Sequence, residues 1–171
     1  MSKLPIDDIL SPLAECGTQA FIADSVQVAD LLLWILRQTG PASVRISSFS
    51  VAEEFLRRIF FMQRDGLITG LDIILDFKAT HKTLILWPFI EQVVQRCHLA
   101  SNHSKVILVS NGKWHVSVVT SQNLTRGNRY EASCISTERR IFDTLSSKFN
   151  DIVKSHSVPF HDVFRARTNA D

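Results

Sequence analysis

The first half of the chain alternates short apolar runs with longer segments in which apolar residues recur every three or four positions. The short runs, which we expect to form strands, span residues 18–24, 43–50 and 70–77. The longer segments, which we expect to form helices, span residues 25–40, 51–66 and 83–97. This alternation predicts β-α-β-α-β-α units around a parallel sheet.

Polar residues mark the expected starts of these helices. Asp24 followed by Gln27 gives a capping signal for the first helix, and Ser50 followed by Glu53 makes a capping box for the second. Pro88 is expected near the start of the third helix or at a kink in it, because proline lacks the backbone N–H that a helix interior needs. Glycines end the first two helices, at Gly40 and Gly66.

The second half of the chain has a different pattern. Apolar runs at residues 104–110 and 113–120 flank Asn111-Gly112, which is a strong signal for a tight hairpin turn. Another strand is expected at residues 129–136 and an amphipathic helix at 136–157, whereas residues 156–171 show no regular pattern and are expected to be partly flexible. The sequence therefore predicts an α/β fold with a mixed parallel and antiparallel sheet flanked by helices, in one domain spanning residues 1–171.

Composition narrows the class of protein. The chain has 171 residues, of which 45% are hydrophobic, so it can bury a core of its own. Its three cysteines lack the Cys-x-x-Cys spacing of zinc sites and are odd in number, which favours reduced thiols in the cytosol. The N-terminal segment lacks a signal-peptide pattern, and the longest apolar run, "VADLLLWIL", is too short to span a membrane. We expect a cytoplasmic protein without stable membrane association.

Charge is distributed unevenly along the sequence although the net charge is only +2. Residues 1–30 hold one lysine against five carboxylates, a net charge of −4. Residues 101–130 hold two lysines and two arginines without a carboxylate, a net charge of +4. Two solvated surfaces of opposite sign would explain this pattern, and so would an anion-binding site in the basic segment.

The basic segment also carries the residues with the clearest chemistry. His103 and Lys105 are two residues apart, so on a strand they would point the same way. A hairpin at residues 111–112 would bring Ser121 and Asn123 back beside them. On a phosphodiester, an imidazole can attack phosphorus, while a lysine and an asparagine amide can stabilise the phosphate oxygens. Glu131 could hold the imidazole in the required tautomer.

These residues resemble the signature of the phospholipase D superfamily, in which His-x-Lys and four further residues precede an aspartate, and a Gly-Ser-x-Asn follows after a variable gap. Here "HSKVILVS" and "TSQNLT" stand in those places, and "TRGNRYEA" is similar to the segment that holds the family's glutamate. The family's aspartate is Ser110 here, and the glycine is Thr120. The resemblance places the aspartate at the far end of a strand, in a supporting role.

The resemblance also implies a homodimer. Family members use two His-x-Lys motifs, in which one histidine forms a phosphohistidine and the other protonates the leaving oxygen and then activates water. This chain has one such motif. The small bacterial nucleases of the family, which are similar in length, pair two protomers about a two-fold axis, so we expect one active site per homodimer. The scheme requires no metal and no cofactor, because lysines and asparagines supply the charge stabilisation.

The same residues also have purely structural interpretations, which we compare with the functional ones. A single histidine on an apolar strand is more often structural than catalytic, and Ser121 could cap a loop. Arg126 and Arg129 are either solvated loop charges or the lining of a nucleic-acid groove. Asp72 and Asp76 could suggest a metal site, but we interpret them as strand-end groups because no third ligand accompanies them.

Three functions follow from the pattern. The leading hypothesis is a metal-independent endonuclease that cleaves DNA, or RNA, with His103, Lys105, Asn123 and Glu131 as catalytic residues. Phosphate binding would fall to Lys105, Ser121 and Asn123. The second is a nucleic-acid-binding module with weakened catalysis, suggested by Ser110 and Thr120. The third is a phospholipid phosphodiesterase or phosphatidyltransferase, although such enzymes in this superfamily usually have longer chains with two motifs.

Overall fold

A computed structural model describes residues 5–168, without the side chains of residues 5, 79–82, 167 and 168. Its elements in chain order are η1 (Pro5–Asp8), β1 (Thr18–Ala23), α1 (Val28–Thr39), β2 (Ala42–Ser47), α2 (Glu53–Arg64), β3 (Ile68–Asp76), η2 (Phe77–Ala79), α3 (Thr80–Ile85), α4 (Trp87–Val93), β4 (Arg96–Ala100), β5 (Val106–Ser110), β6 (His115–Thr120), β7 (Glu131–Ser136), α5 (Arg139–Ser155), β8 (Ser157–Pro159) and α6 (Phe160–Thr168).

The eight strands within residues 5–168 form one mixed sheet in the order β1-β7-β6-β5-β2-β3-β4-β8. Strands β2, β3 and β4 are parallel, and β5, β6 and β7 are antiparallel to their neighbours, which confirms the predicted mixed sheet. The expectation that the first strand belongs to the parallel part is wrong, since β1 pairs antiparallel with β7 at the sheet edge. The alternation of strands and helices along the sequence does not specify which strand lies beside which in the sheet, and β1 pairs with the distant β7.

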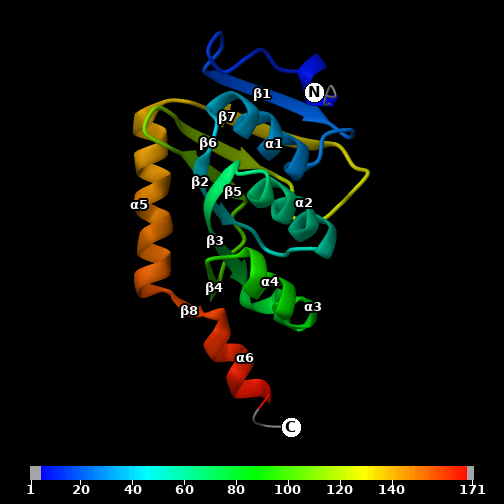
Figure 1. Cartoon of the computed structure of the whole chain (residues 1–171), viewed down its shortest axis with the longest axis vertical. Coiled ribbons are helices and arrows are strands. Elements are labelled where there is room, and N and C mark those ends of the chain that lie inside the picture. Colours follow the sequence, from blue (N-terminus) through cyan, green and yellow to red (C-terminus); the bar gives the residue numbers. More distant parts are fainter. Residues whose placement is uncertain (1–4, 169–171) are drawn as a thin grey trace.

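Helices cover the two faces of the sheet unequally. Helices α1, α2 and α4 lie on one side and α5 on the other (Figure 1). The larger core, on the α1 side, includes the fully buried Leu31, Ile35 and Ile59, and full burial of such a side chain stabilises the fold by about 1.5–3 kcal/mol. On the α5 side, Phe142 and Phe149 pack in a smaller cluster with Ile74, Ala100 and Leu108.

The ends of the first two helices differ slightly from the prediction. Gln27 is the N-cap of α1 and forms a capping box with Asp30, whereas α2 begins after Ala52, without a side-chain cap. The predicted capping signal is therefore displaced at α1, and the predicted capping box is absent at α2. Both helices end where glycine was expected, because Gly40 and Gly66 adopt φ values of 73° and 74° that disfavour other residues.

The third predicted helix is divided. Helix α3 ends at Ile85, and α4 begins at Trp87 with Pro88 in its first turn, as expected for a proline near a helix start. The predicted extension of the helix to residue 97 is wrong, since Arg96–Ala100 forms β4 and pairs in parallel with β3. Pairing with a neighbouring strand overrides the weak helical pattern of this short segment.

The β5–β6 hairpin has a longer loop than predicted. Ser110 pairs with His115, which leaves the four residues 111–114 in the connection. The Asn111 side chain organises this loop, because its Oδ1 accepts hydrogen bonds from the backbone N–H groups of Lys113 (2.9 Å) and Trp114 (2.8 Å). Asn111 thus acts through its side chain and not in the expected two-residue turn with Gly112.

The C-terminal segment is more regular than predicted. Residues 157–159 form β8 beside β4, and α6 follows from Phe160 to Thr168. Phe160 is fully buried, and its ring centroid lies 4.7 Å from that of Trp87. The rings of His161 and Phe164 also lie against Trp87, so these contacts fix a segment whose sequence lacks a clear period. Residues 169–171 lie outside the described residues.

Candidate active site

Strand ends gather several of the candidate residues at one edge of the sheet, which we call the site edge. It contains the last residues of β1, β2, β3 and β6 and the first residues of β5 and β7. Lys105 lies just before β5, where its carbonyl accepts a hydrogen bond from the backbone N–H of Thr120 (3.0 Å). Glu131 begins β7, and the Ser121 N–H donates to the neighbouring Ala132 carbonyl (2.9 Å). Three separate segments therefore meet at this edge.

Buried Asn102 anchors the segment that carries His103 and Lys105. The Asn102 side chain is almost inaccessible, and its Nδ2 donates to the Ser48 carbonyl (3.1 Å). Its Oδ1 accepts from the Ser47 hydroxyl (3.1 Å) and from the Ser104 N–H (3.1 Å). Its backbone N–H donates to Asp76 Oδ2 (2.7 Å). Asn102 thereby ties the motif to the ends of both β2 and β3, and loss of these buried bonds would leave polar groups unpaired.

His103 and Lys105 themselves are placed differently from the expectation of a shared strand face. Both precede the first residue of β5, so they lie at its entrance. The His103 ring is exposed and contacts Phe49, with ring centroids 5.4 Å apart and planes tilted by 57°. Lys105 Nζ folds back to donate to the His103 carbonyl (3.1 Å). The two residues remain at the same edge, but strand alternation is not what puts them there.

Ser121 and Glu131 contact each other directly. The Ser121 hydroxyl donates to Glu131 Oε2, and the same hydroxyl oxygen accepts from the Ala132 N–H (3.0 Å). The other carboxylate oxygen of Glu131 lies 4.0 Å from an Arg129 nitrogen. In the described part of the chain, the recorded partners of the Glu131 carboxylate are thus Ser121 and Arg129. The expected contact from Glu131 to the His103 imidazole stays a prediction.

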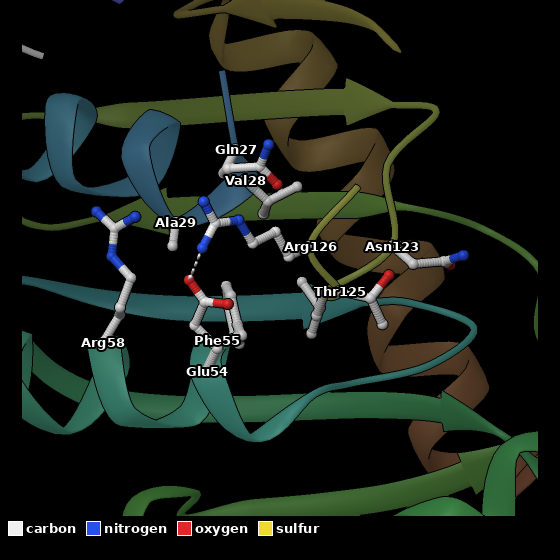
Figure 2. A pocket seen from close by; sticks show the side chains of 10 residues that line it. Gln27, Val28, Ala29, Glu54, Phe55, Arg58, Asn123, Thr125 and Arg126 are labelled. Carbon is white, nitrogen blue, oxygen red and sulfur yellow. Dashed lines mark hydrogen bonds and ion pairs between the residues drawn. The ribbon is translucent and has the colours of Figure 1, made fainter. Parts of the chain in front are cut away.

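Asn123 lies between two buried anchors. Before it, the Gln122 side chain donates to the Val26 carbonyl (3.0 Å), and after it, the Leu124 N–H donates to the Ser50 carbonyl (3.2 Å). The Asn123 Oδ1 atom is buried and has no hydrogen-bond partner among the described residues. Figure 2 shows the side chain pointing away from the neighbouring pocket, with its amide nitrogen outermost. An amide held in this way presents N–H donors outward, as phosphate binding requires.

The two departures from the family motif have clear places in the structure. Thr120 ends β6, and its hydroxyl donates to the Ala132 carbonyl (3.1 Å) and accepts from the Gln122 N–H (3.1 Å) and the Ser133 hydroxyl (2.8 Å). It therefore helps to close the turn into Ser121. Ser110 is the last residue of β5, at the opposite edge of the sheet, roughly 20 Å along the chain from His103 at the usual rise of a strand.

The basic side chains do not form one patch. Lys113 lies in the β5–β6 loop at the opposite edge, with its ammonium 5.9 Å from the Trp114 ring centroid. Arg126 is exposed and reaches Glu54 of α2 (3.4 Å), across a pocket between α1, α2 and the loop that contains Asn123 (Figure 2). Arg129 is exposed near Glu131. Arg126 and Arg129 thus flank Asn123 and Glu131, as a groove would need, while Lys113 does not.

The two aspartates of β3 serve different partners. Asp76 ends the strand and holds Asn102, as expected of a strand-end group, whereas Asp72 lies within the strand and binds Arg96 through two hydrogen bonds. The hydrogen bond to Asp72 raises the pKa of Arg96. Near them, burial and then the charge of Arg96 lower the pKa of His98. Within the described residues, no three histidine, cysteine or acidic side chains gather as metal ligands do.

Known proteins resemble this chain in structure, whereas no match was found by sequence. Neither a family model nor a curated protein sequence matches this chain. The solved structure of Nuc from Salmonella typhimurium, a phospholipase D family member, is similar with a TM-score of 0.65 at 16% identity over 81% of this chain and 95% of that one. NucT from Helicobacter pylori is similar with a TM-score of 0.61 at 16% identity, over 81% and 96% of the two chains.

The chain has a phospholipase D-like fold. A phosphatidylserine synthase from Haemophilus influenzae shares this fold, with a TM-score of 0.58 at 11% identity over 83% of this chain and 39% of that one. At such identities the likeness concerns the fold. The α/β class with a mixed sheet, which the sequence predicted, is confirmed by it. In addition, no helix among residues 5–168 has both the length and the apolar character needed to cross a bilayer.

Several residues that support the candidate site were not predicted from the sequence. Asn102, Ser47, Ser48 and Ser104 form the buried hydrogen-bond network, and Phe49 contacts the His103 ring. A signal was present, because "SSFS" stands at the end of the strand predicted over residues 43–50 and Asn102 immediately precedes the motif histidine. The ends of adjacent parallel strands meet at one sheet edge, so polar residues there are expected to lie near one another.

Proposed function

We propose that the protein is a metal-independent phosphodiesterase that cleaves nucleic acid, most readily DNA, through a phosphohistidine on His103. The observation that carries this proposal is the meeting of three segments at the site edge of a phospholipase D-like fold, where the Lys105 carbonyl accepts a hydrogen bond from Thr120, the residue before Ser121, and Ser121 donates to Glu131. Each group has a task on a phosphodiester, and the two departures from the motif leave the site edge intact.

The proposed reaction runs in two steps. In the first, a ring nitrogen of His103 attacks phosphorus, the P–O bond to the leaving group breaks, and the leaving oxygen takes a proton from a second histidine. In the second, that histidine removes a proton from water, the water oxygen attacks phosphorus, and the P–N bond breaks to release His103. Lys105 and Asn123 stabilise the negative charge on the non-bridging oxygens during both steps.

The second histidine is proposed to come from a second copy of the chain. One chain carries one His-x-Lys motif, and the reaction needs both a nucleophile and an acid. A symmetric homodimer of two 171-residue domains, each contributing His103, would complete one site. An imidazole with an ordinary pKa of about 6.5 can serve as base or acid near neutral pH. The three free cysteines fit a reducing, cytoplasmic setting for this dimer.

Nucleic acid is the proposed substrate class because basic side chains flank the candidate site. Arg126 and Arg129 lie in the loop between Asn123 and Glu131, and both are exposed. A polyanion offers further phosphates to such residues, whereas a single lipid head group does not. A binding module with weakened catalysis is the second candidate, because Thr120 occupies the place of the motif glycine and its hydroxyl is engaged in three hydrogen bonds.

Cleavage of plasmid and single-stranded DNA in excess EDTA tests the proposal. The wild type should cleave, and His103→Ala should lose all measurable activity. His115→Ala is the matched control, because this histidine lies at the opposite edge of the sheet against Phe142. Binding without cleavage by the wild type would favour the weakened binding module. Turnover of phosphatidylcholine with DNA left intact would favour the lipid enzyme.

A further inference from the structure

A separate hollow lies between α5 and the sheet, away from the site edge, and we call it the α5 hollow. Its volume is about 230 Å³. Strands β3 and β4 contribute Asp72, Arg96 and His98 to its lining, and α5 contributes Phe149, Asn150 and Lys154. Asp72 lies four residues before Asp76, which ends β3. At the usual rise of a strand the hollow is therefore roughly 13 Å from the site edge.

Three charged residues form a row across the sheet beside the α5 hollow. Arg45 of β2 and Arg96 of β4 are the register partners of Asp72, which lies between them on β3. Asp72 gives both carboxylate oxygens to Arg96, since Oδ1 accepts from Nε (2.9 Å) and Oδ2 accepts from Nη2 (2.5 Å). Burial lowers the pKa of Arg45, and the charge of Asp72 offsets only part of this effect. The row therefore carries an excess of positive charge at Arg45.

Arg45 is held in place by two aromatic rings but makes few hydrogen bonds within the described residues. Its half-buried guanidinium lies over the rings of Phe142 and Phe149, at 5.7 and 5.8 Å from their centroids. In the described part of the chain its one hydrogen bond runs from Nη1 to Asn150 Oδ1 (3.3 Å). A guanidinium has five N–H donors. The rings thus fix a cation next to the hollow with donors available to an anion.

The polar groups that α5 brings to the hollow are also donors. Because Asn150 accepts from Arg45 through Oδ1, its Nδ2 amide group remains as a donor. Lys154 is exposed in the last turn of α5 and makes no ion pair with a carboxylate among residues 5–168. Three cations, Arg45, Arg96 and Lys154, thus surround one carboxylate. The C-terminus of α5 adds only about half a negative charge, so the excess stays positive.

We propose that the α5 hollow binds a terminal phosphate group, as inorganic phosphate or as a small phosphate monoester. Such a group presents three acceptor oxygens and close to two negative charges, which match the donors and the excess positive charge. The hollow is smaller than the roughly 300–1,000 Å³ of sites that hold drug-sized ligands, so it suits one phosphate with a small substituent and not a nucleic-acid chain. Phe149 and Val153 would contact the carbon atoms of that substituent. Binding here does not depend on the reaction proposed at the site edge.

NMR titration of the histidine rings in the full chain, at pH 7.5 and constant ionic strength, tests the proposal. Inorganic phosphate and ribose 5-phosphate should each shift the signals of His98 to saturation, and His98→Gln identifies those signals. Lys154→Gln should raise the dissociation constant about three- to tenfold. Lys148→Gln is the matched control on the same helix, because the Lys148 ammonium pairs with Asp151 (3.2 Å), and it should bind phosphate as the wild type does.

Further variants and a second readout complete the test. Arg45→Gln should weaken binding at least about tenfold, because it removes the fixed cation. Circular dichroism checks its fold, and Asn150→Ala is the alternative should Arg45→Gln fail to fold. Thermal unfolding gives an independent readout, because a ligand that binds the folded state raises Tm. Phosphate should raise the Tm of the wild type and of Lys148→Gln more than that of Lys154→Gln, with chloride at equal ionic strength as the reference.

The outcomes separate this site from the site edge. Shifts confined to the His103 signals would place the phosphate at the site edge and overturn the proposal. Shifts that grow linearly without saturation, or equal affinities in Lys154→Gln, Asn150→Ala and the wild type, would also overturn it. Tighter binding of ribose 5-phosphate would support a monoester as the ligand, and tighter binding of inorganic phosphate would support the free ion.

Discussion

Two asparagines, nine residues apart, fix the chain at opposite ends of β5. Asn111 folds the loop after β5, where it accepts from two backbone N–H groups and donates to the carbonyls of Thr39 and Pro41. Asn102 does the same before β5, with the ends of β2 and β3 as its partners. Asn111 is half-buried and Asn102 is almost fully buried. The same device therefore closes both edges of the sheet, but at one of them it positions a histidine and a lysine.

The comparison separates residues that build the fold from residues that carry chemistry. The loop at Asn111 includes Lys113 and follows Ser110, and nothing else at that edge belongs to the motif. The segment at Asn102 leads into His103 and Lys105, and the Lys105 carbonyl accepts a hydrogen bond from Thr120, which precedes Ser121, the partner of Glu131. Matched substitutions at the two edges should therefore cost similar stability but very different activity.

The largest difference is expected between two lysines. Lys105→Gln removes a charge proposed to stabilise the non-bridging phosphate oxygens, so kcat/KM for DNA cleavage should fall by about 10²–10³-fold. Lys113→Gln removes the same charge at the opposite edge and should leave kcat/KM within about twofold of the wild type. Steady-state cleavage of a fluorescent oligonucleotide measures both. Equal losses in the two variants would mean that charge acts at long range and that the site edge has no special role.

The next largest difference is expected between the asparagines themselves. Asn102→Ala and Asn111→Ala each leave several polar groups unpaired, so each should lower the free energy of unfolding by about 1–3 kcal/mol. The Asn102 variant should in addition lower kcat by about tenfold or more, with little change in KM, because the reacting groups are displaced while the arginine-flanked surface persists. Urea unfolding and initial rates distinguish the two effects. A kcat for Asn102→Ala that equals that of Asn111→Ala would reduce Asn102 to a purely structural role.

A smaller effect is expected at the arginines near the site edge. Arg126 and Arg129 are exposed and their ion pairs are long, at 3.4 and 4.0 Å, so their loss should hardly affect folding. Replacing either by glutamine should weaken DNA binding a few fold and reduce the slope of log K against log salt by about 0.7–0.9. Binding is measured by fluorescence anisotropy with His103→Ala, so that the DNA stays intact. An unchanged slope in both variants would place the bound DNA elsewhere.

The smallest effect concerns pH and folding. Burial and the charge of Arg96 lower the pKa of His98 in the folded state, so the unfolded chain binds the proton more readily. This contribution to stability is complete above about pH 6.5, the unfolded value, and is lost as the pH falls below it. His98→Gln should remove that part of the pH dependence, as urea unfolding at pH 7.5 and 5.5 would show. A steeper acid loss in His98→Gln than in the wild type would contradict this assignment.

Thiol reactivity offers a related check on the interior. Burial raises the pKa of the Cys97 thiol to about 12, so Cys97 should stay protonated and react slowly with iodoacetamide at pH 8. Exposed Cys134 should react faster. Peptide mapping after timed alkylation of the native protein compares the two thiols. Rapid labelling of Cys97 would show that β4 opens readily.

Much of this fold can be predicted from the pattern of apolar residues within single segments of the sequence. The helices at α1, α2 and α5 follow from apolar periodicity, because each buries one face against the sheet, and the strands at β2, β3, β5, β6 and β7 follow from short apolar runs. The pairing of strands that are distant in the sequence cannot be predicted from such patterns. Strand β1 pairs with β7, more than one hundred residues away. The short β4 depends on pairing with β3 and β8 for its extended form.

The candidate site, too, has one part that can be predicted from the sequence and one part that cannot. The spacing of His103, Lys105, Ser121 and Asn123 is visible in the sequence, and so is Glu131. The contact between Ser121 and Glu131 depends on the register of β6 and β7, and the Asn102 network depends on the adjacency of β2, β3 and β5. Supporting residues come from three strand ends, so no single stretch of sequence contains them.

The most direct measurement of the central claim is the capture of a covalent intermediate. Quenching of a single turnover with denaturant at alkaline pH, using an end-labelled oligonucleotide and followed by peptide mapping at alkaline pH, should find the label on His103 through an acid-labile, alkali-stable P–N bond. The His115→Ala control should carry the same label, and His103→Ala should carry none. DNA cleavage at wild-type rate without label on any histidine, or with full activity in His103→Ala, would contradict the account.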